Sequence, residues 1–284
     1  MISSNSFDAV QKTRHGSVSD VQEFFSQNPS ILPNFDRSLL LSECHDFSKV
    51  HLLHQLGCRF HDRQNEALAV LIFSSRPKSI SDIIETYSLN MKRYGYLPLF
   101  SALLHQDRGM VRMLLDKGAK ADNEILRISY ELGICSDEIQ NAISNDFSIP
   151  SKYDYIIMAG KLASIIWEYA FLDVIRNPPF KRYLEDFCWM HSYSGVLYRG
   201  HLSPISGSQI QFSAPFSCTE NIDVAKDFGN FILRISGNDL PAFNIEDYGG
   251  FSDMYEDQRE FIVAPVTFSI VSVNENIYDL KIKS

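Results

Sequence analysis

Residues 107–119 read Asp107-Arg108-Gly109-Met110-Val111-Arg112-Met113-Leu114-Leu115-Asp116-Lys117-Gly118-Ala119. The apolar residues of this stretch recur at spacings of three and four, which is typical of a short amphipathic helix. Gly118 stands where such a helix should end, because glycine readily adopts the left-handed conformation of a helix C-terminus. The stretch therefore predicts a helix followed by a tight turn.

The same pattern occurs three more times, in segments that begin at Ser17, Asp46 and Ser79. Alignment of Val21, Val50, Ser81 and Val111 gives steps of 29, 31 and 30 residues. A period of this length in a helical sequence indicates a solenoid of stacked helix pairs.

The fourth unit resembles the second helix and turn of an ankyrin repeat, and residues 50–58 are a looser copy. The resemblance covers about residues 16–145, although the Thr-Pro-Leu-His tetrapeptide of ankyrin repeats is missing. It implies an all-α, ankyrin-like domain over residues 1–148 that binds a partner protein. An irregular helical bundle is the alternative.

Composition limits the classes of function. The chain of 284 residues is 45% hydrophobic and long enough for two cores. A net charge of −9 with no run of Lys or Arg argues against nucleic-acid binding. No apolar stretch is long enough to span a membrane, and Met1–Ser6 does not resemble a signal peptide. Five scattered cysteines are typical of reduced thiols. We expect a cytoplasmic monomer, or one secreted into a host cytosol without a cleaved signal.

One cluster of residue types suggests zinc, but its spacing does not. No Cys-x-x-Cys pair is present, and histidines are common on the surfaces of solenoid helices. We therefore predict no metal site. The six residues lie within 18 positions: Cys44, His45, His51, His54, Cys58 and His61.

The pattern changes after Pro150, where helices are followed by strands. This order favours an α+β domain over residues 149–284. Asn177-Pro178-Pro179 predicts a break between the two helices. The expected helices cover residues 154–176 and 180–191, and the expected strands cover 196–198, 230–235, ending at Ser236-Gly237, and 260–273.

Three segments of this half occur in a recognisable order. They read Val196-Leu197-Tyr198-Arg199-Gly200, then Phe216-Ser217-Cys218-Thr219, then Gln258-Arg259-Glu260. After the middle segment, five residues separate Thr219 from Ala225, and Phe228 follows three residues later. This spacing is part of the pattern. Together the segments resemble the Arg–Ser–Glu class of mono-ADP-ribosyltransferases, over about residues 150–280. The resemblance implies a mixed α/β-sandwich domain that uses NAD as its substrate.

The resemblance also implies a role for each motif residue. Glu260 would stabilise the positive charge that develops on the ribose when nicotinamide leaves. Arg199 would bind the pyrophosphate with its forked donors. Ser217 would orient Glu260. Tyr198, Gly200 and Phe228 would contact the nucleotide, with Gly200 allowing its close approach. Asn221 should cap a short helix that runs through Phe228.

One departure bears on the acceptor. Arginine-modifying members carry Glu where this chain has Gln258, and Gln-x-Glu resembles C3-type toxins and related bacterial effectors. A neutral amide aligns an acceptor but cannot take a proton from arginine. We therefore expect Asn, Gln, Thr or Ser as acceptor, unless a bulge brings Glu256 into the site. Phe251 and Tyr255, on a glycine-containing loop, are expected to contact the target protein, or else to pack on their own domain.

Each motif residue also has an ordinary structural explanation. Arg199 could be a surface arginine, Ser217 a strand-end hydroxyl, and residues 256–260 a solvated edge. Two further functions stay open beside the transferase: an NAD glycohydrolase with water as acceptor, and a binding scaffold on an inactive transferase fold.

Overall fold

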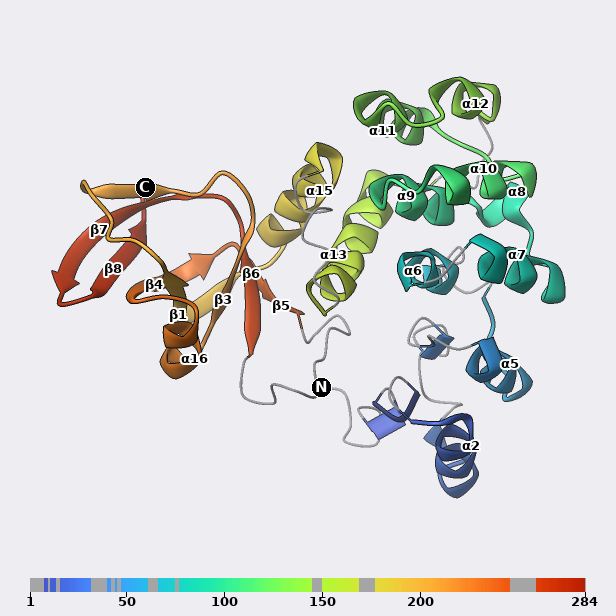
Figure 1. The fold of residues 1–284 in the computed structure, drawn as a ribbon, viewed down its shortest axis with the longest axis horizontal. Helices are drawn as coiled ribbons and strands as arrows, with labels where there is room; N and C mark the ends of the chain where they lie inside the picture. Colours follow the sequence, from blue (N-terminus) through green and yellow to red (C-terminus); the bar gives the residue numbers. More distant parts are fainter. Residues whose placement is uncertain are drawn as a thin grey trace. The chain divides into compact units, whose positions relative to one another are not determined.

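The computed structural model of the chain describes residues 8–9, 11–13, 16–31, 40–41, 44, 47–60, 66–74, 77–144, 150–168, 177–245 and 259–283. The chain divides into two compact units, Met1–Ser151 and Lys152–Ser284. Helices make up the first unit, whereas the second combines helices with one mixed sheet (Figure 1). This composition agrees with the predicted α+β class. Among the described residues, no helix is long and apolar enough to cross a membrane.

Each of the four repeated sequence segments forms a helix, namely α2, α5, α7 and α10. The helices of the first unit are α2 (Val18–Gln27), α5 (Phe47–Gln55), α6 (Glu66–Ser74), α7 (Pro77–Thr86), α8 (Met91–Tyr94), α9 (Tyr96–Leu104), α10 (Arg108–Asp116), α11 (Asn123–Leu132) and α12 (Ser136–Asn141).

Helices that are close in sequence pair, and the pairs stack. α6 packs on α7, α9 on α10, and α11 on α12. Between pairs, α9 contacts both α6 and α11, and α10 contacts both α7 and α12. The first helix of each pair therefore packs on first helices and the second on second helices. Every residue of the central helix α9 is buried, and the hydroxyl of its one Ser, Ser101, donates to the carbonyl of Ala69.

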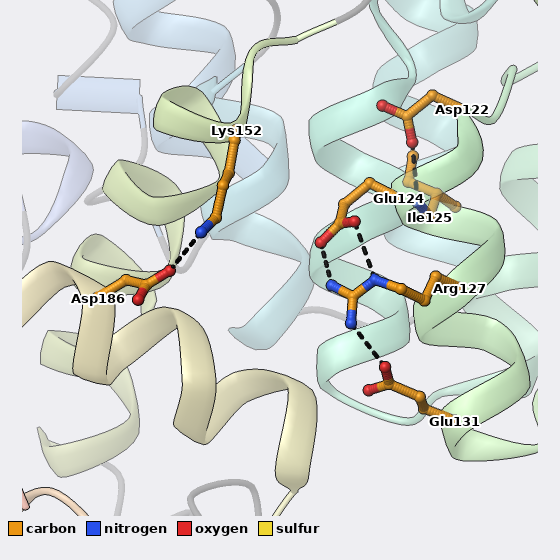
Figure 2. Close-up of polar contacts among 7 residues, drawn as sticks. All are labelled: Asp122, Glu124, Ile125, Arg127, Glu131, Lys152 and Asp186. Carbon is orange, nitrogen blue, oxygen red and sulfur yellow. Dashed lines mark hydrogen bonds and ion pairs between the residues drawn. The ribbon is translucent and has the colours of Figure 1, made fainter.

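Side chains also fix the ends and the exposed faces of these helices. Figure 2 shows Asp122 at the start of α11, where its carboxylate accepts from the Ile125 amide at 2.8 Å. Arg127 on the same helix forms ion pairs with Glu124 one turn before it and with Glu131 one turn after it. Such pairs support a helix locally and contribute only a few tenths of a kcal/mol each.

The repeat is most regular in its turns. Gly57, Ser88 and Gly118 follow α5, α7 and α10, and each has a positive φ, at 97°, 49° and 91°. They are 31 and 30 residues apart, as the sequence period requires. The residue after each one donates its amide to a carbonyl near the helix end, at 2.9–3.0 Å. Ser88 is the only one of the three with a Cβ, which disfavours the left-handed conformation.

The substitution Ser88→Gly should therefore stabilise the helical unit by about 0.5–1 kcal/mol, because the side chain of Ser88 is exposed and its backbone is left-handed. Gly118→Ser is the matched control. A Cβ at Gly118 would meet nothing within 4 Å, so only backbone strain should destabilise that variant, by a similar amount. Urea denaturation measures both changes, and a less stable Ser88→Gly protein would contradict the assignment.

The second unit begins with two helices, α13 (Lys152–Glu168) and α15 (Pro178–Trp189). Lys152 and Asp186 join them through an ion pair of 2.8 Å (Figure 2). Asn177 lies outside the helix, as expected of a break, but α15 begins two residues earlier than the predicted start at Phe180. The prolines are its first residues, and Asn177 caps it, accepting from the Phe180 amide at 3.3 Å. Proline is favoured there, since the first helical residues donate no hydrogen bond within the helix.

The sheet has eight strands in the order β2-β7-β8-β4-β1-β3-β6-β5. All the pairings are antiparallel except that of β4 with β8. The short helix α16 (Ile222–Asp227) follows β3. The strands are β1 (Tyr193–His201), β2 (Gln209–Gln211), β3 (Phe216–Thr219), β4 (Phe231–Leu240), β5 (Ala242–Asn244), β6 (Glu260–Val263), β7 (Thr267–Asn274) and β8 (Ile277–Ile282).

Strand boundaries correct the sequence expectation in two places. β1 is longer than the predicted 196–198, and β4 does not stop at Ser236-Gly237 but continues to Leu240. The cause is tertiary, because Ser236 pairs with Val196 and Gly237 pairs with Gly195 on the neighbouring strand. The predicted strand 260–273 is divided into β6 and β7 by residues 264–266.

Three phenylalanines show that the sheet folds over its own core. Phe212 stacks on Phe216 of β3 with ring centroids 3.8 Å apart, and Phe268 of β7 meets both rings edge-on. Since β3 and β7 lie four strands apart in the sheet order, contact between their rings requires strong curvature. The buried members of this core are Leu197, Phe216, Cys218, Leu233, Ile235, Leu240, Ala242, Phe261, Val263, Phe268, Tyr278 and Leu280.

Candidate active site

The three sequence motifs lie on three adjacent strands. β3 lies between β1 and β6, and Thr219 of β3 pairs with Tyr198 on one side and with Glu260 on the other. A single row of residues therefore crosses all three strands. Segments that are far apart in the sequence become neighbours because β3 pairs along both of its edges.

Arg199 reaches from β1 to Ser217 on β3. Its Nη1 donates to the Ser217 carbonyl at 2.6 Å and lies 3.5 Å from the Ser217 hydroxyl. The guanidinium carbon is 5.5 Å from the ring centroid of Phe216, a cation–π contact that helps to hold the side chain. Nε and Nη2 of Arg199 form no hydrogen bond with a described residue. These donors are thus available to an anion that offers two oxygens.

Glu260 is the motif residue whose carboxyl pKa the fold brings close to neutrality. Burial raises the pKa of its carboxyl from 4.5 to about 7, even though a hydrogen bond from the Ser217 hydroxyl and the charge of Arg199 both lower the pKa. Ser217 therefore bonds to Arg199 and also lowers the pKa of Glu260. A carboxyl that titrates near neutrality, beside a cation, is typical of functional sites.

Gly200 has a packing role that differs from the expected one. A Cβ at Gly200 would lie 2.3 Å from the Ala225 carbonyl oxygen and 2.8 Å from the Phe228 Cβ. A Cβ at Gly229 would lie 2.4 Å from the His201 carbonyl oxygen. The two glycines thus let the end of α16 pack directly on β1. At Gly200, the space of a side chain is filled by α16 and not left for a nucleotide.

α16 itself agrees with the sequence. Asn221 caps the helix as predicted, with its side chain accepting from the Asp223 amide at 2.9 Å. The helix ends at Asp227, and Phe228 is 62% exposed beside Gly200. Its ring is therefore exposed on the side of β1 to which a side chain at position 200 would point. Tyr198 is half-buried in β1.

The two departures in the middle motif have structural explanations. Cys218 is buried in the sheet core, where burial raises the pKa of its thiol to about 12 and keeps it protonated. Thr219 is also buried, and its hydroxyl accepts from the Asn221 amide at 3.0 Å. Thr219 therefore shapes the turn into α16.

Several predicted site residues lie outside the described part of the chain. Gln258, Glu256, Phe251 and Tyr255 belong to this group, so their roles stay predictions.

The residues of the suspected zinc cluster make other contacts where the structure describes them. His51 lies 3.3 Å from the Tyr87 hydroxyl, and the ring of His54 packs on that of Tyr87 with centroids 4.2 Å apart. His45 and His61 lie outside the described part. None of the five cysteines forms a disulfide, and among the described residues no three metal-binding side chains gather.

Sequence reasoning missed one group of polar side chains beside the site. Glu220 accepts from the Tyr193 hydroxyl at 2.9 Å and from Arg259 at 3.0 Å. The only signal in the sequence is that Glu220 follows Thr219 and Arg259 precedes Glu260. A separate open pocket of about 620 Å³ includes none of the motif residues. It is lined by Gly195, Val196, Ser236, Gly237, Asn238, Asp239, Lys281 and Ile282.

Comparison of the chain with family models, with curated proteins and with solved structures finds no match. The functional assignment therefore depends on the geometry and the chemistry of Arg199, Ser217 and Glu260.

The raised pKa of Glu260 predicts a pH-dependent stability. The folded state holds the proton up to about pH 7 and the unfolded state only to about 4.5, so this stabilisation is present at low pH and is lost as the pH rises through 7. Glu260→Gln should abolish the loss, which we expect to be on the order of 2 kcal/mol between pH 5 and pH 8 for a partly exposed group. Urea denaturation at the two pH values measures it.

Ser217→Ala provides the second arm of this experiment. Removal of a hydrogen bond that lowers the pKa should move the loss of stability to higher pH. An identical pH dependence in the wild type and in Glu260→Gln would show that the carboxyl is solvated.

Proposed function

We propose that the second unit is a mono-ADP-ribosyltransferase, which cleaves NAD and transfers ADP-ribose to a side chain of a target protein. The observation that carries the proposal is that Arg199 bonds to Ser217 on β3, and that Glu260 begins the strand that pairs with the other edge of β3 and has a raised pKa there. These residues come from three separate sequence segments, and each is the one to which the resemblance to the Arg–Ser–Glu class assigns a role. A surface arginine and a solvated edge would not be expected to lie on the two strands that flank one short strand, with the arginine bonded to that strand and the carboxyl largely buried.

Glu260 suits the difficult part of the reaction. As the bond between C1′ of the ribose and the nicotinamide nitrogen breaks, its electron pair leaves with nicotinamide and the ribose becomes positively charged. An ionised Glu260 beside the ribose stabilises that charge, and the acceptor then bonds to C1′ and loses its proton. Because the pKa of Glu260 is about 7, the ionised form and hence the turnover should increase as the pH rises through neutrality.

Arg199 suits the pyrophosphate of NAD. Its donors Nε and Nη2 face no described acceptor, and its position is held by Ser217 and Phe216. The exposed ring of Phe228 and the half-buried Tyr198 are proposed to flank the nucleotide. NAD is thus the substrate of the site and not a resident cofactor.

We also propose that the first unit is an ankyrin-like solenoid that selects the target protein. The support is its repeated turn and the stacking of helix pairs, first on first and second on second. An irregular bundle would not be expected to keep both features in register. The acceptor is proposed to be Asn, Gln, Thr or Ser because of Gln258, and the target to be a host protein modified by a bacterial effector.

Incubation of the full chain with labelled NAD and a cell lysate tests the function. A labelled protein band supports the transferase. Release of free nicotinamide without a labelled band would indicate an NAD glycohydrolase instead. If neither product appears, the remaining function is that of a binding scaffold.

Glu260→Ala should lower kcat by about a hundredfold or more and leave the KM for NAD nearly unchanged, because the carboxylate stabilises charge that exists only in the transition state. Release of nicotinamide measures both constants. Glu275→Ala removes an exposed carboxylate from the turn between β7 and β8 and should behave as the wild type. Near-normal turnover of Glu260→Ala would refute the assignment.

Arg199→Lys should raise the KM for NAD about tenfold, since an ammonium keeps the charge but loses one of two charge-assisted hydrogen bonds to the pyrophosphate. The control is Arg112→Lys, at an exposed arginine of α10 that pairs with Glu138 at 3.2 Å. An unchanged KM in Arg199→Lys would mean that Arg199 does not bind the pyrophosphate.

A further inference from the structure

A second polar cluster lies directly beside Glu260. It consists of Tyr193, Glu220 and Arg259, and we refer to it as the Glu220 cluster. The Tyr193 hydroxyl donates to one oxygen of Glu220 at 2.9 Å, and Arg259 Nη1 donates to the other oxygen at 3.0 Å. Tyr193 is the first residue of β1, Glu220 directly follows β3, and Arg259 directly precedes β6, so the cluster joins the three strands of the site.

Arg259 has an unfavourable backbone conformation. Its φ is 36°, in the left-handed region that a side chain with a Cβ rarely adopts. Glu260 follows at once, pairs with Thr219 and begins β6. The φ and ψ of Arg259 therefore determine the direction in which the chain enters β6, and with it the position of the Glu260 carboxylate. Strain of this kind persists only where neighbouring contacts hold it.

The side chain of Glu220 is positioned to hold Arg259 in this conformation. Its side chain is only 30% exposed, although that of Arg259 is 68% exposed. Glu220 directly follows Thr219, which is the residue that pairs with Glu260. An isolated surface ion pair contributes little, but here one oxygen of the carboxylate is already fixed by Tyr193, so fewer degrees of freedom are lost when Arg259 binds the other.

Tyr193 is itself fixed in position. Its ring packs on that of Phe261 in β6, with centroids 4.7 Å apart. It also lies over Gly195, where a Cβ would be 2.5 Å from the Tyr193 hydroxyl oxygen. Burial and the bond to Glu220 raise the pKa of Tyr193 to about 12, so the hydroxyl remains a donor at neutral pH.

We propose that the Glu220 cluster positions the catalytic carboxylate: Glu220, held by Tyr193, keeps Arg259 in its left-handed conformation and so directs Glu260 toward the reacting ribose. Glu220, Tyr193 and Arg259 are positioning residues, since they act through Glu260. The inference rests on the proposed NAD-cleaving activity, and its test has a readout that does not depend on that activity.

The first arm measures kinetics with the full-length protein. Glu220→Ala should lower kcat for nicotinamide release about tenfold and change the KM for NAD less than about twofold, because a displacement of about 1 Å at a catalytic group is enough for such a loss. Tyr193→Phe, which keeps the ring on Phe261, should give a smaller loss. Arg112→Ala breaks an exposed ion pair with Glu138 in the helical unit and should leave kcat unchanged.

Two replacements of Arg259 separate the backbone effect from the loss of the ion pair. Arg259→Ala and Arg259→Gly both remove the guanidinium, but only glycine adopts a positive φ easily. Arg259→Gly should therefore retain several-fold more turnover than Arg259→Ala. The double variant Glu220→Ala/Arg259→Ala should be no worse than the poorer single variant, because both changes remove one shared contact. Additive losses, or equal turnover of the Gly and Ala variants, would overturn the proposal.

The second arm measures amide hydrogen exchange without NAD. Glu220→Ala should speed exchange in peptides that cover residues 259–263 and leave residues 267–274 unchanged. Unchanged exchange in β6 would overturn the cluster as a structural constraint. Faster exchange with normal kcat would overturn its positioning role. If the wild type does not cleave NAD, the proposed function fails and the positioning role fails with it, whereas the exchange experiment still decides whether the cluster holds β6.

Discussion

The candidate site depends on the pairing of one four-residue strand with two neighbours. β3 has only Phe216, Ser217, Cys218 and Thr219, yet it lies between β1 and β6. Phe216 and Cys218 alternate along the strand and fill the core, and this burial sets the register of β3. With that register, Ser217 is placed beside Arg199 and Thr219 opposite Glu260. A shift by one residue would turn Phe216 and Cys218 away from the core and would also move Ser217 away from Arg199, so one register determines both the core and the site.

Burial and charge oppose each other at Glu260. Removal of water disfavours the ionised form, whereas Arg199 and the Ser217 hydroxyl favour it, and burial is the larger effect. The carboxyl is therefore close to balance at neutral pH. In the proposed reaction, the positive charge that develops on the ribose would likewise favour the ionised form. The ionised carboxylate would then be most stable in the transition state, where the ribose carries the most positive charge. A barrier is lowered only by interactions that are stronger in the transition state than in the ground state.

The helical unit is organised by a different principle. Its helices stack because each exposes an apolar face that the next pair covers, and α9, in the middle, is buried along its whole length. The residue with a positive φ after α5, α7 and α10 lets the chain turn at the same position in each repeat. Helices about thirty residues apart, such as α6 and α9, therefore pack on each other, and the same kind of contact recurs along the described part of the unit. In the proposed function, the helical unit recognises the target protein and the sheet carries the catalytic site.

The sequence by itself determined the features that depend on neighbouring residues. The period of about thirty predicted four helices, which the structure contains, and Gly57 and Gly118 marked turns that have a positive φ. Asn221 was recognisable as a cap because its partner is two residues away. The order of the three motifs also indicated which residues to compare, although not that Arg199 would bond to Ser217.

Only the tertiary structure decided the features that depend on residues far apart in the chain. β4 continues through Ser236 and Gly237 because β1 pairs with them, and β2 and β5, of three residues each, exist only through their partners. Gly200 is required by the end of α16, which no local pattern indicates. The pKa of Glu260 and the contacts of Glu220 likewise arise from burial and from side chains on other strands. Local periodicity and capping can be read along a chain, whereas desolvation and strand pairing are set by what the completed fold brings together.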